Sequence, residues 1–282
     1  MNYFQPNDLN SAFDVLKNNS DLTIAAGCTD LFPVTNNISL DKNILDITNI
    51  KSMRGFELNN KNTKIGAATT WTDIVNENLP SCYDMLKACA KEVGSIQIQN
   101  LGTIGGNICN ASPAADSIPC LLALDAMLEL SSLDNQRIIP INEFILGSRK
   151  TKLEQGEILT SIIIPKEKEK GNSSFKKIGA RKYLVISISM VACRILISDN
   201  VIEDISISIG SCSEVAKRIF SIERQLINKN INEDIFNQVD FSQLNEISPI
   251  TDIRSTQVYR LKASQSLIKD VVADTINKLE IE

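Results

Sequence analysis

The sequence predicts an α+β fold built in two parts. The chain has 282 residues, which is more than one compact core usually needs. Helical and strand patterns are mixed in its first part, and the charged run KEKEKGNS at 166–173 then indicates a solvated turn or linker. Beyond this run the pattern changes to successive strands followed by helices, which is typical of an α+β unit. We therefore expect one unit over 1–168, subdivided into about 1–52 and 53–168, and a smaller one over 172–282.

The first unit opens with a helix and continues with short strands and helices. Residues 8–18 repeat apolar side chains at helical spacing, from Leu9 to Leu16. Thr70 is expected to cap a helix, because its hydroxyl can accept a backbone N–H of the first turn. The other expected elements are strands at 21–27 and 43–47, a hairpin at 54–66 with NNKN as its turn, helices at 71–78, 81–93 and near 117–124, and strands at 126–130 and 157–165.

The second unit begins with strands and ends with helices. Its expected strands are SFKKIGA at 174–180, ISISMVACRILI at 186–197 and VIEDISISIG at 201–210. Hairpin turns are expected at Arg181–Lys182 and at Ser198–Asn200, and helices at 213–228 and 256–279.

Composition and charge argue against several classes of protein. The net charge of −5, without a basic cluster, argues against nucleic acid as the main partner. No apolar run approaches the roughly 20 residues that a membrane span needs. The N-terminus lacks the basic-then-apolar layout of a signal peptide. We therefore expect a cytoplasmic protein without a membrane span.

The cysteines point to buried thiols rather than to a disulfide framework or a metal site. They are Cys28, Cys82, Cys89, Cys109, Cys120, Cys193 and Cys212. Their number is odd, they are scattered, and no C-x-x-C occurs among them, which fits a reducing compartment. They also fail the common zinc and iron–sulfur spacings, so we expect no metal bound by this chain.

The chain contains no histidine. This excludes Ser–His–Asp and Cys–His catalysis within the subunit, histidine metal sites and flavin attached through histidine. It also removes the most frequent general base. Either other groups carry the chemistry, or a cofactor or a partner does.

Two glycine-containing segments are candidates for anion binding. The first loop is AAGCTDLFP at 25–33, directly after an expected strand, and the second loop is TIGGN at 103–107. Neither is a dinucleotide fingerprint or a P-loop. Glycines Gly27, Gly105 and Gly106 can adopt positive φ at little cost, so that successive N–H groups form an anion-binding concavity. With hydroxyls from Thr29 and Thr103, the two loops are predicted to converge on one pyrophosphate; the alternative is a pair of ordinary turns.

The second loop also lies within a longer motif. QNLGTIGGNICNASPAAD at 99–116 resembles the second flavin loop of the FAD subunits of molybdenum hydroxylases, whose pattern is similar to I-R-N-x-G-T-I-G-G-N-x-x-x-A-S-P-x-x-D. That family includes the medium subunits of bacterial xanthine, nicotinate and carbon monoxide dehydrogenases. AAGCTDL resembles its first loop, A-G-G-T-D-L. Further similar segments are YFQPNDLNSAFDVLKNN at 3–19, EILTSIIIP at 157–165 and SFKKIGARKYLVIS at 174–187.

The resemblance spans nearly the whole chain and implies a fold and a cofactor. The implied fold is a two-part α+β FAD-binding domain of the PCMH type, similar to vanillyl-alcohol oxidase relatives, followed by a smaller α+β domain like the C-terminal domain of carbon monoxide dehydrogenase flavoproteins. The implied cofactor is non-covalent FAD. The residues that the resemblance assigns to it are Ala25, Ala26, Gly27, Cys28, Thr29, Asp30, Leu31, Thr103, Ile104, Gly105, Gly106, Asn107, Ser112, Asp116, Leu159, Lys177 and Ile186.

The later residues in this set have ordinary alternative roles. A lysine beside the flavin would stabilise its reduced ring, but Lys177 also fits a solvated strand lysine. Asp116 is equally a helix N-cap candidate, and Ser112 before a proline fits simple turn chemistry. Leu159 matches a residue that borders the flavin, and Ile186 is otherwise a core residue.

The sequence departs from the family pattern in the first loop. Cys28 stands where the family has its second glycine, and the loop fits if the φ of that residue is negative. Cys28 is also an alternative covalent tether for a flavin. Some relatives have histidine at the position of Thr29, and the family often has an acidic residue at that of Val185. Tyr183 is either a shield over the flavin ring or an ordinary strand or turn residue.

The resemblance implies a role in electron transfer. In the resembled complexes a molybdopterin-binding large subunit oxidises the substrate, and a small subunit with [2Fe-2S] clusters carries electrons to FAD, which passes them to NAD or another acceptor. Two alternatives remain open. One is a stand-alone flavin oxidoreductase of the same superfold, with Tyr183 or Asp116 as proton donor, and the other is a flavin-free binding or assembly protein.

Overall fold

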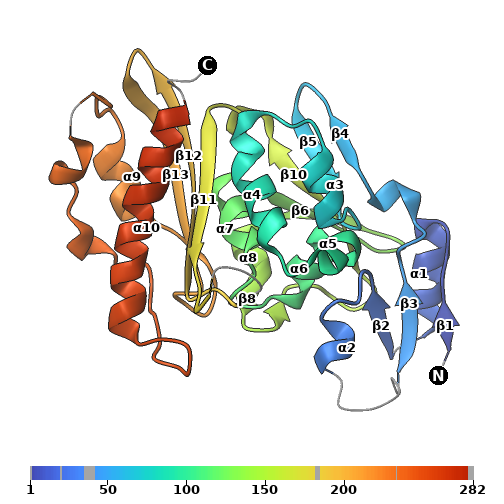
Figure 1. Cartoon of the computed structure of the whole chain (residues 1–282). Coiled ribbons are helices and arrows are strands. Elements are labelled where there is room, and N and C mark those ends of the chain that lie inside the picture. The colour runs from blue at the N-terminus through green and yellow to red at the C-terminus, as the bar shows by residue number, and fades with distance from the viewer. Residues whose placement is uncertain (1, 20, 35–41, 182–184, 233, 279–282) are drawn as a thin grey trace.

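The computed structural model describes residues 2–19, 21–34, 42–181, 185–232 and 234–278. Three larger sheets follow one another through the molecule, each accompanied by helices, and a fourth sheet is a two-stranded hairpin (Figure 1). Tyr183 and part of the turn expected at Arg181–Lys182 lie outside the described residues, as does the end of the helix expected at 256–279. The mixture of helices and sheets confirms the predicted α+β class.

The N-terminal sheet is parallel and delivers the first loop. Its strands, in the order β1-β3-β2, are β1 (Tyr3–Phe4), β3 (Asn43–Asp46) and β2 (Leu22–Ala25). Helix α1 (Leu9–Asn18) is capped by Asp8, whose carboxylate accepts the Ser11 N–H at 2.9 Å. The first loop ends in a short helix, α2 (Leu31–Val34), where the sequence predicted loop alone.

The central sheet is antiparallel. Its strands, in spatial order, are β4 (Phe56–Leu58), β5 (Asn62–Gly66), β10 (Ile158–Pro165), β6 (Met127–Ser131) and β7 (Gln136–Pro140). A small hairpin follows from β8 (Ile145–Gly147) and β9 (Lys150–Thr151). The predicted hairpin at 54–66 and the strands near 126–130 and 157–165 are confirmed.

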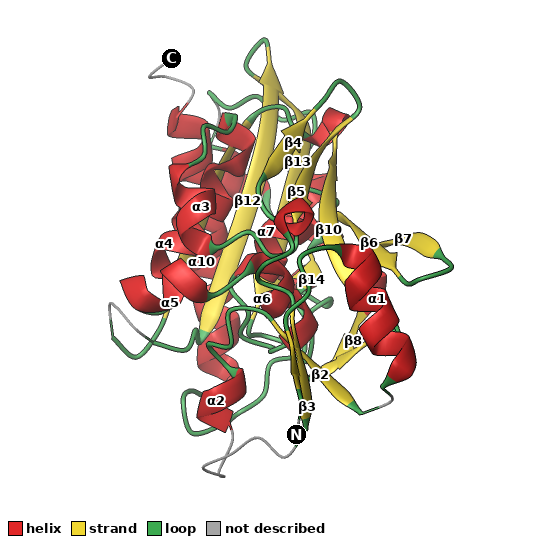
Figure 2. Cartoon of the chain, turned by 90° about the vertical axis from the view of Figure 1, so that its right-hand side faces the viewer, coloured by secondary structure: helices red, strands yellow, loops and turns green. Residues whose placement is uncertain are grey.

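Helices surround the first core beside this sheet. They are α3 (Trp71–Asn76), α4 (Asp84–Glu92), α5 (Ile96–Leu101), α6 (Ile104–Asn110), α7 (Ser117–Ala123) and α8 (Ile141–Phe144). Figure 2 shows α3, α4 and α5 on one side of the molecule and β6, β7 and β10 on the other. Thr70 caps α3 as predicted. The Asp73 carboxylate accepts the Thr70 N–H at 2.9 Å, which completes a capping box.

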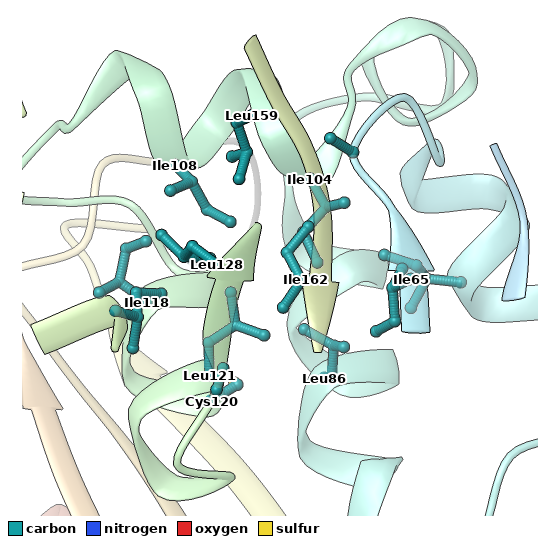
Figure 3. Packing of buried hydrophobic residues seen from close by; sticks show 14 of the residues in the cluster. Ile65, Leu86, Ile104, Ile108, Ile118, Cys120, Leu121, Leu128, Leu159 and Ile162 are labelled. Atoms are coloured by element: carbon teal, nitrogen blue, oxygen red, sulfur yellow. The ribbon is translucent and has the colours of Figure 1, made fainter. Parts of the chain in front are cut away.

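Fully buried aliphatic side chains fill the space between these helices and the sheet (Figure 3). Ile104 and Ile108 of α6 point into this core beside Ile162 of β10. Burying each such side chain stabilises the fold by about 1.5–3 kcal/mol before the entropy cost. The second loop is therefore anchored by its own helix.

The C-terminal sheet is antiparallel and carries two helices. Its strands are β11 (Asn172–Ile178), β12 (Ser189–Ser198), β13 (Val201–Gly210) and β14 (Lys217–Arg218). Asp199 and Asn200 both have positive φ, which is the backbone of a tight two-residue hairpin and confirms the turn expected at Ser198–Asn200. The helices are α9 (Phe220–Leu226) and α10 (Gln257–Asn277).

The helix predicted at 213–228 is wrong in its first half. Lys217 and Arg218 pair with β13 as strand β14, so α9 begins only at Phe220. The predicted helix at 256–279 is α10, whose first turn is capped by the Thr256 hydroxyl.

The C-terminal sheet is a wall of both cores. Along β12, Met190 and Ala192 belong to the first core, whereas Val191, Cys193 and Ile195 belong to the second. This division follows from the strand geometry, since successive side chains point to opposite faces. The second core is closed on its other side by α9 and α10.

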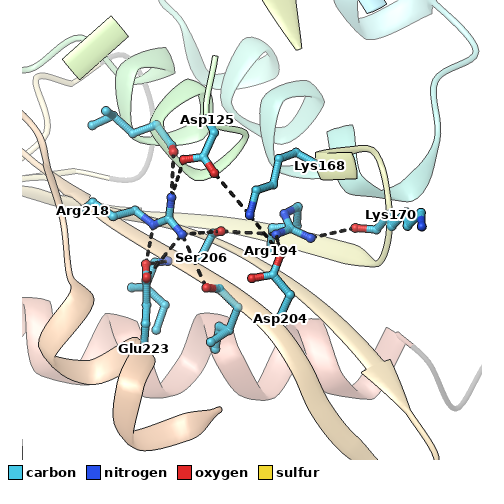
Figure 4. A network of polar contacts seen from close by, with 11 residues as sticks. Asp125, Lys168, Lys170, Arg194, Asp204, Ser206, Arg218 and Glu223 are labelled. Carbon is cyan, nitrogen blue, oxygen red and sulfur yellow. Dashed lines mark hydrogen bonds and ion pairs between the residues drawn. The ribbon is translucent and has the colours of Figure 1, made fainter. Parts of the chain in front are cut away.

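A charge cluster joins the two units beside this sheet (Figure 4). Its charged members are Asp125, Lys168, Arg194, Asp204, Arg218 and Glu223. Arg218 Nη1 lies 2.7 Å from Oδ1 of Asp125, which follows α7. Lys168, from the charged linker, reaches Asp125 at 3.2 Å and Asp204 at 3.1 Å. The linker is therefore tied into the fold rather than fully solvated.

Within the described ranges, no helix is both long enough and apolar enough to cross a membrane. Nor do the described residues bring together three or more side chains of the types that hold a metal ion.

Candidate cofactor site

Most of the predicted cofactor residues border one cavity of about 570 Å³. Those that line it are Ala25, Ala26, Gly27, Cys28, Thr29, Asp30, Leu31, Thr103, Gly105, Gly106, Asn107 and Leu159. Both loops thus meet at one cavity, although they lie about 75 residues apart in the chain. The remaining predicted residues, Ile104, Ser112, Asp116, Lys177 and Ile186, lie elsewhere.

The backbone N–H groups of residues 26–30 in the first loop are open to a ligand. Between residues 26 and 30, no backbone N–H donates a hydrogen bond to any acceptor in the part of the chain that the structure describes. Gly27 packs so tightly that an added Cβ would lie 1.8 Å from the carbonyl oxygen of Leu101. The loop therefore packs against the end of α5, and its N–H groups at 26–30 remain available to bind a ligand.

The positive φ predicted for Gly27 falls instead on Cys28. Cys28 has φ 55°, and Gly27 does not adopt positive φ. The condition under which the cysteine was expected to fit, a negative φ, is therefore not met. A side chain stands in a left-handed conformation that favours glycine.

The Cys28 thiol is not activated. It donates a weak hydrogen bond to the Ala26 carbonyl at 3.3 Å. Burial raises the pKa of this thiol, and the nearby Asp46 carboxylate raises it further. Since the thiolate is the reactive form, this environment works against a covalent tether.

The second loop is the start of a helix, so the prediction of a nest at Gly105 and Gly106 is wrong. Neither glycine has positive φ, and both lie in α6. The Gly105 N–H donates to the Ala67 carbonyl at 2.9 Å, and the Gly106 N–H donates to the Thr103 hydroxyl at 3.1 Å. Thr103 acts as the helix N-cap, which consumes donors that a nest would offer.

The two glycines of this loop serve close packing instead. A Cβ on Gly105 would lie 2.6 Å from Ala67, on the segment that follows β5. A Cβ on Gly106 would meet only the Thr103 hydroxyl, at 2.8 Å. The absence of a side chain at Gly105 thus lets α6 approach the sheet. At Gly106 it leaves space in the cavity.

Asp116 and Lys177 form a buried ion pair outside this cavity. Lys177 Nζ lies 2.6 Å from Asp116 Oδ2, and the Ser187 hydroxyl donates to Asp116 Oδ1 at 2.7 Å. The Lys177 side chain is only 6% exposed, so it is not the solvated strand lysine of the alternative interpretation. Burial alone lowers the pKa of Lys177, but the Asp116 carboxylate outweighs this and raises it above its ordinary value.

Asp116 does not cap α7 through its side chain. It occupies the position before Ser117, but its carboxylate makes no capping bond. Both carboxylate oxygens are committed to Lys177 and Ser187. The expected N-cap is therefore wrong, since a charged partner on the next unit outcompetes the local N–H groups.

Ser112 and Ile186 border a second cavity of about 660 Å³. Ser112 accepts the Ala114 N–H at 3.3 Å, which is the turn chemistry of the alternative interpretation. Ile186 is 53% exposed and so is not a core residue. Arg260 and Ser211 also line this cavity, and their Nε and Oγ atoms are buried with no hydrogen-bond partner among the described residues.

Ile104 contributes to the core rather than to the cavity. Its side chain is fully buried, and its N–H donates to the Thr69 carbonyl at 3.0 Å.

Sequence reasoning missed several residues that complete the first cavity. Val93, Leu153 and Ile158 add apolar surface, and Arg149 adds a cation. Arg149 borders both cavities. Its Nη1 lies 2.5 Å from Asp30 Oδ2 and also bonds Asn110. No pattern in the sequence marked this arginine, because its partners lie far away in the chain.

Comparison with known proteins supports the same assignment along the chain. The family described as the FAD binding domain in molybdopterin dehydrogenase matches residues 1–167, and the CO dehydrogenase flavoprotein C-terminal domain matches residues 173–275. The chain is 29% identical over 278 residues to a xanthine dehydrogenase FAD-binding subunit of Escherichia coli O157:H7, covering 97% of this chain and 95% of that protein. It is also 29% identical over 260 residues to the glyceraldehyde dehydrogenase medium chain of Sulfolobus acidocaldarius, covering 92% of each.

A solved structure supports the fold. A chain of carbon monoxide dehydrogenase from Hydrogenophaga pseudoflava superposes with a TM-score of 0.88, covering 98% of this chain and 97% of that chain at 23% identity. The resemblance inferred from the motifs and the predicted fold class are therefore confirmed. The chain belongs to the FAD-binding subunits of the molybdopterin dehydrogenases, an oxidoreductase family of the xanthine and carbon monoxide dehydrogenase type.

Proposed function

We propose that this chain is the electron-transfer flavoprotein subunit of a molybdenum hydroxylase complex. It binds FAD without a covalent bond, receives electrons from [2Fe-2S] clusters of a small subunit and passes them to NAD or another acceptor. The observation that carries the proposal is that residues 26–30 line the cavity with backbone N–H groups that have no acceptor among the described residues. Such a row of donors suits an anionic cofactor.

The cavity fits FAD in size and in chemistry. Its volume of about 570 Å³ lies within the range of cofactor sites. The N–H groups at 26–30 and the Thr29 hydroxyl would hold the diphosphate. Apolar side chains such as Val93 and Leu153 supply surface for flat aromatic rings. The poorest fit is Cys28, whose side chain stands where the family has glycine.

Bound FAD would supply redox chemistry that accepts electrons singly or in pairs, which suits a junction between iron–sulfur clusters and a two-electron acceptor. The chain itself binds and orients. The Asp116–Lys177 pair holds Ser187 at the border of the second cavity, where Ser112 and Ile186 also lie. We infer that the second cavity is the side from which an electron acceptor reaches the flavin. We also propose that residues 1–168 hold the cofactor and that 172–282 complete the lining of the second cavity.

The partners are inferred from the relatives. Several similar proteins are named as FAD-binding subunits or medium chains, and one similar structure is described as a Cu,Mo-CO dehydrogenase. By the same reasoning, this chain would assemble with a [2Fe-2S] small subunit and a molybdopterin-binding large subunit.

A stand-alone flavin oxidoreductase is a weaker proposal. It would need its own proton donor, and Asp116 is committed to an ion pair and a hydroxyl. Tyr183, the other candidate, lies outside the described residues. A flavin-free assembly protein would leave the open donors of the first loop without a ligand.

The test begins with reconstitution. The purified chain is incubated with FAD, freed of excess, and its visible spectrum is recorded before and after acid precipitation. We expect a flavin spectrum with all colour released into the supernatant. Colour retained in the pellet would mean a covalent flavin, and a protein that stays colourless would contradict the proposal. Reduction of the bound flavin by a reduced iron–sulfur partner, and not by an organic substrate alone, would then support electron transfer.

A further inference from the structure

The first cavity has one described source of positive charge. Among its lining residues in the described ranges, Arg149 is the only one with a cationic side chain. Asp30 is the only carboxylate among them. Lys177 lies outside the cavity and is already paired with Asp116. A dianionic diphosphate placed here would therefore depend on Arg149 for a counter-charge.

Arg149 is placed to reach across the cavity. It follows β8, and its backbone N–H is fixed by the Ala111 carbonyl at 2.9 Å. Its side chain contacts Asp30 of the first loop and Asn110 at the end of α6. One guanidinium thus joins the elements that carry both loops.

The guanidinium has donors to spare. Only its Nη1 atom makes side-chain hydrogen bonds, whereas Nε and Nη2 have no partner among the described residues. The side chains of Arg149 and Asp30 are 50% and 48% exposed. An ion pair this exposed is weak and can be exchanged, and a guanidinium fork binds phosphate oxygens in two parallel bonds.

The backbone conformation at residue 149 is also consistent with a role for the arginine side chain. Arg149 has φ 59°, a left-handed conformation that costs free energy in any residue other than glycine. Glycine would relieve that cost but would remove the cation.

We propose that the Arg149 guanidinium binds the diphosphate of the cofactor. In the absence of cofactor, Asp30 holds the guanidinium at the cavity, and the diphosphate then replaces Asp30 as its partner. This inference rests on the proposed function and deepens it. It makes Asp30 a competitor of the ligand rather than a contact to it.

The test compares FAD with riboflavin, which lacks the diphosphate. Dissociation constants are measured by flavin fluorescence titration for the wild type, Arg149→Gln, Arg149→Lys and Asp30→Asn. We expect Arg149→Gln to weaken FAD binding about tenfold or more while riboflavin changes by less than about twofold. Arg149→Lys keeps the charge without the fork and should lie between. Asp30→Asn should tighten FAD binding by about threefold, because a competing carboxylate is removed.

Arg54→Gln is the matched control. Arg54 is 54% exposed and pairs with Asp73 at 2.8 Å, away from the cavity lining. It should leave both affinities unchanged. The dependence of FAD affinity on salt is a second measurement that needs no riboflavin, and it should be shallower in Arg149→Gln than in the wild type.

The outcomes separate the two proposals. Equal losses for FAD and riboflavin, or an unchanged salt dependence, would overturn the role of Arg149 while leaving the flavin site intact. Weaker FAD binding in Asp30→Asn would do the same, even if Arg149→Gln failed to fold. A wild-type protein that binds neither flavin would overturn the proposed function itself.

Discussion

Residues 26–30 of the first loop have backbone N–H groups with no acceptor among the described residues, whereas the second loop uses its N–H groups in the first turn of a helix. In the first loop, residues 26–30 have no described acceptor for their N–H groups. In the second loop, Ile104, Gly105 and Gly106 donate to acceptors within the fold. Two segments with similar composition thus have different roles. The first loop offers backbone N–H donors, and the second loop forms the start of a helix that lines the cavity. Glycine content alone does not distinguish them.

The largest effect is expected from Gly27→Ala. Its Cβ would lie 1.8 Å from the Leu101 carbonyl oxygen, so the first loop would have to leave α5. We expect a loss of about 4 kcal/mol or more in the free energy of unfolding, measured by urea denaturation. Gly106→Ala is the control in the second loop, where the added Cβ meets only the Thr103 hydroxyl. It should fold and lose flavin affinity; similar stability in both variants would contradict the close packing of Gly27.

Thr103→Val should cost about 1 kcal/mol of stability, because the Gly106 N–H loses its capping acceptor. Thr29→Val in the first loop is the counterpart. The Thr29 hydroxyl has no hydrogen-bond partner in the described structure, so its removal should leave the melting temperature unchanged and weaken FAD binding. If the two variants exchanged these effects, the division of labour between the loops would be wrong.

Cys28→Gly should stabilise the protein by about 1 kcal/mol, since the left-handed φ of 55° suits glycine. Cys28→Ala removes the thiol but keeps a Cβ, so it should bring no such gain. Thermal denaturation of the three proteins measures the difference. A gain in both variants would mean that the thiol, and not the backbone, is the source of the cost.

The smallest effect is a difference in thiol reactivity between the loops. Burial and then the Asp46 carboxylate raise the pKa of Cys28, and burial raises the pKa of Cys109, in α6, to about 12. A raised pKa lowers the thiolate fraction at neutral pH, so alkylation by iodoacetamide should be slow at pH 8 and accelerate as the pH rises beyond 9. Cys28 should react before Cys109, followed by mass spectrometry of peptides. Rapid alkylation of Cys28 at pH 7 would contradict the raised pKa and would favour Cys28 as a covalent attachment site for the flavin.

The sequence predicted most elements of the fold because their signals are local. The Thr70 cap, the hairpin around NNKN and the Asp199–Asn200 turn depend on neighbouring residues alone. The α6 helix was missed because two glycines lower its helix propensity, while burial of Ile104 and Ile108 overrides that preference.

The parts of the site that were missed depend on distant partners. The first loop places Gly27 against the distant Leu101 carbonyl oxygen and puts the positive φ on Cys28. Asp116 left its expected capping role for Lys177, 61 positions along the chain. Arg149 meets Asp30 across 119 positions, and no local pattern records such a pair. The family motifs brought most of the cavity residues together in advance, but their backbone conformations had to be observed.

The sheet that faces both cores limits how this chain can be recombined. A chimera joined at the linker between 168 and 172 would take Met190 and Ala192 from one parent and their packing partners from the other. It would also separate Asp125 from Arg218. Shuffling of the C-terminal unit among related flavoproteins should therefore succeed only when the matching face of the first core is transplanted with it.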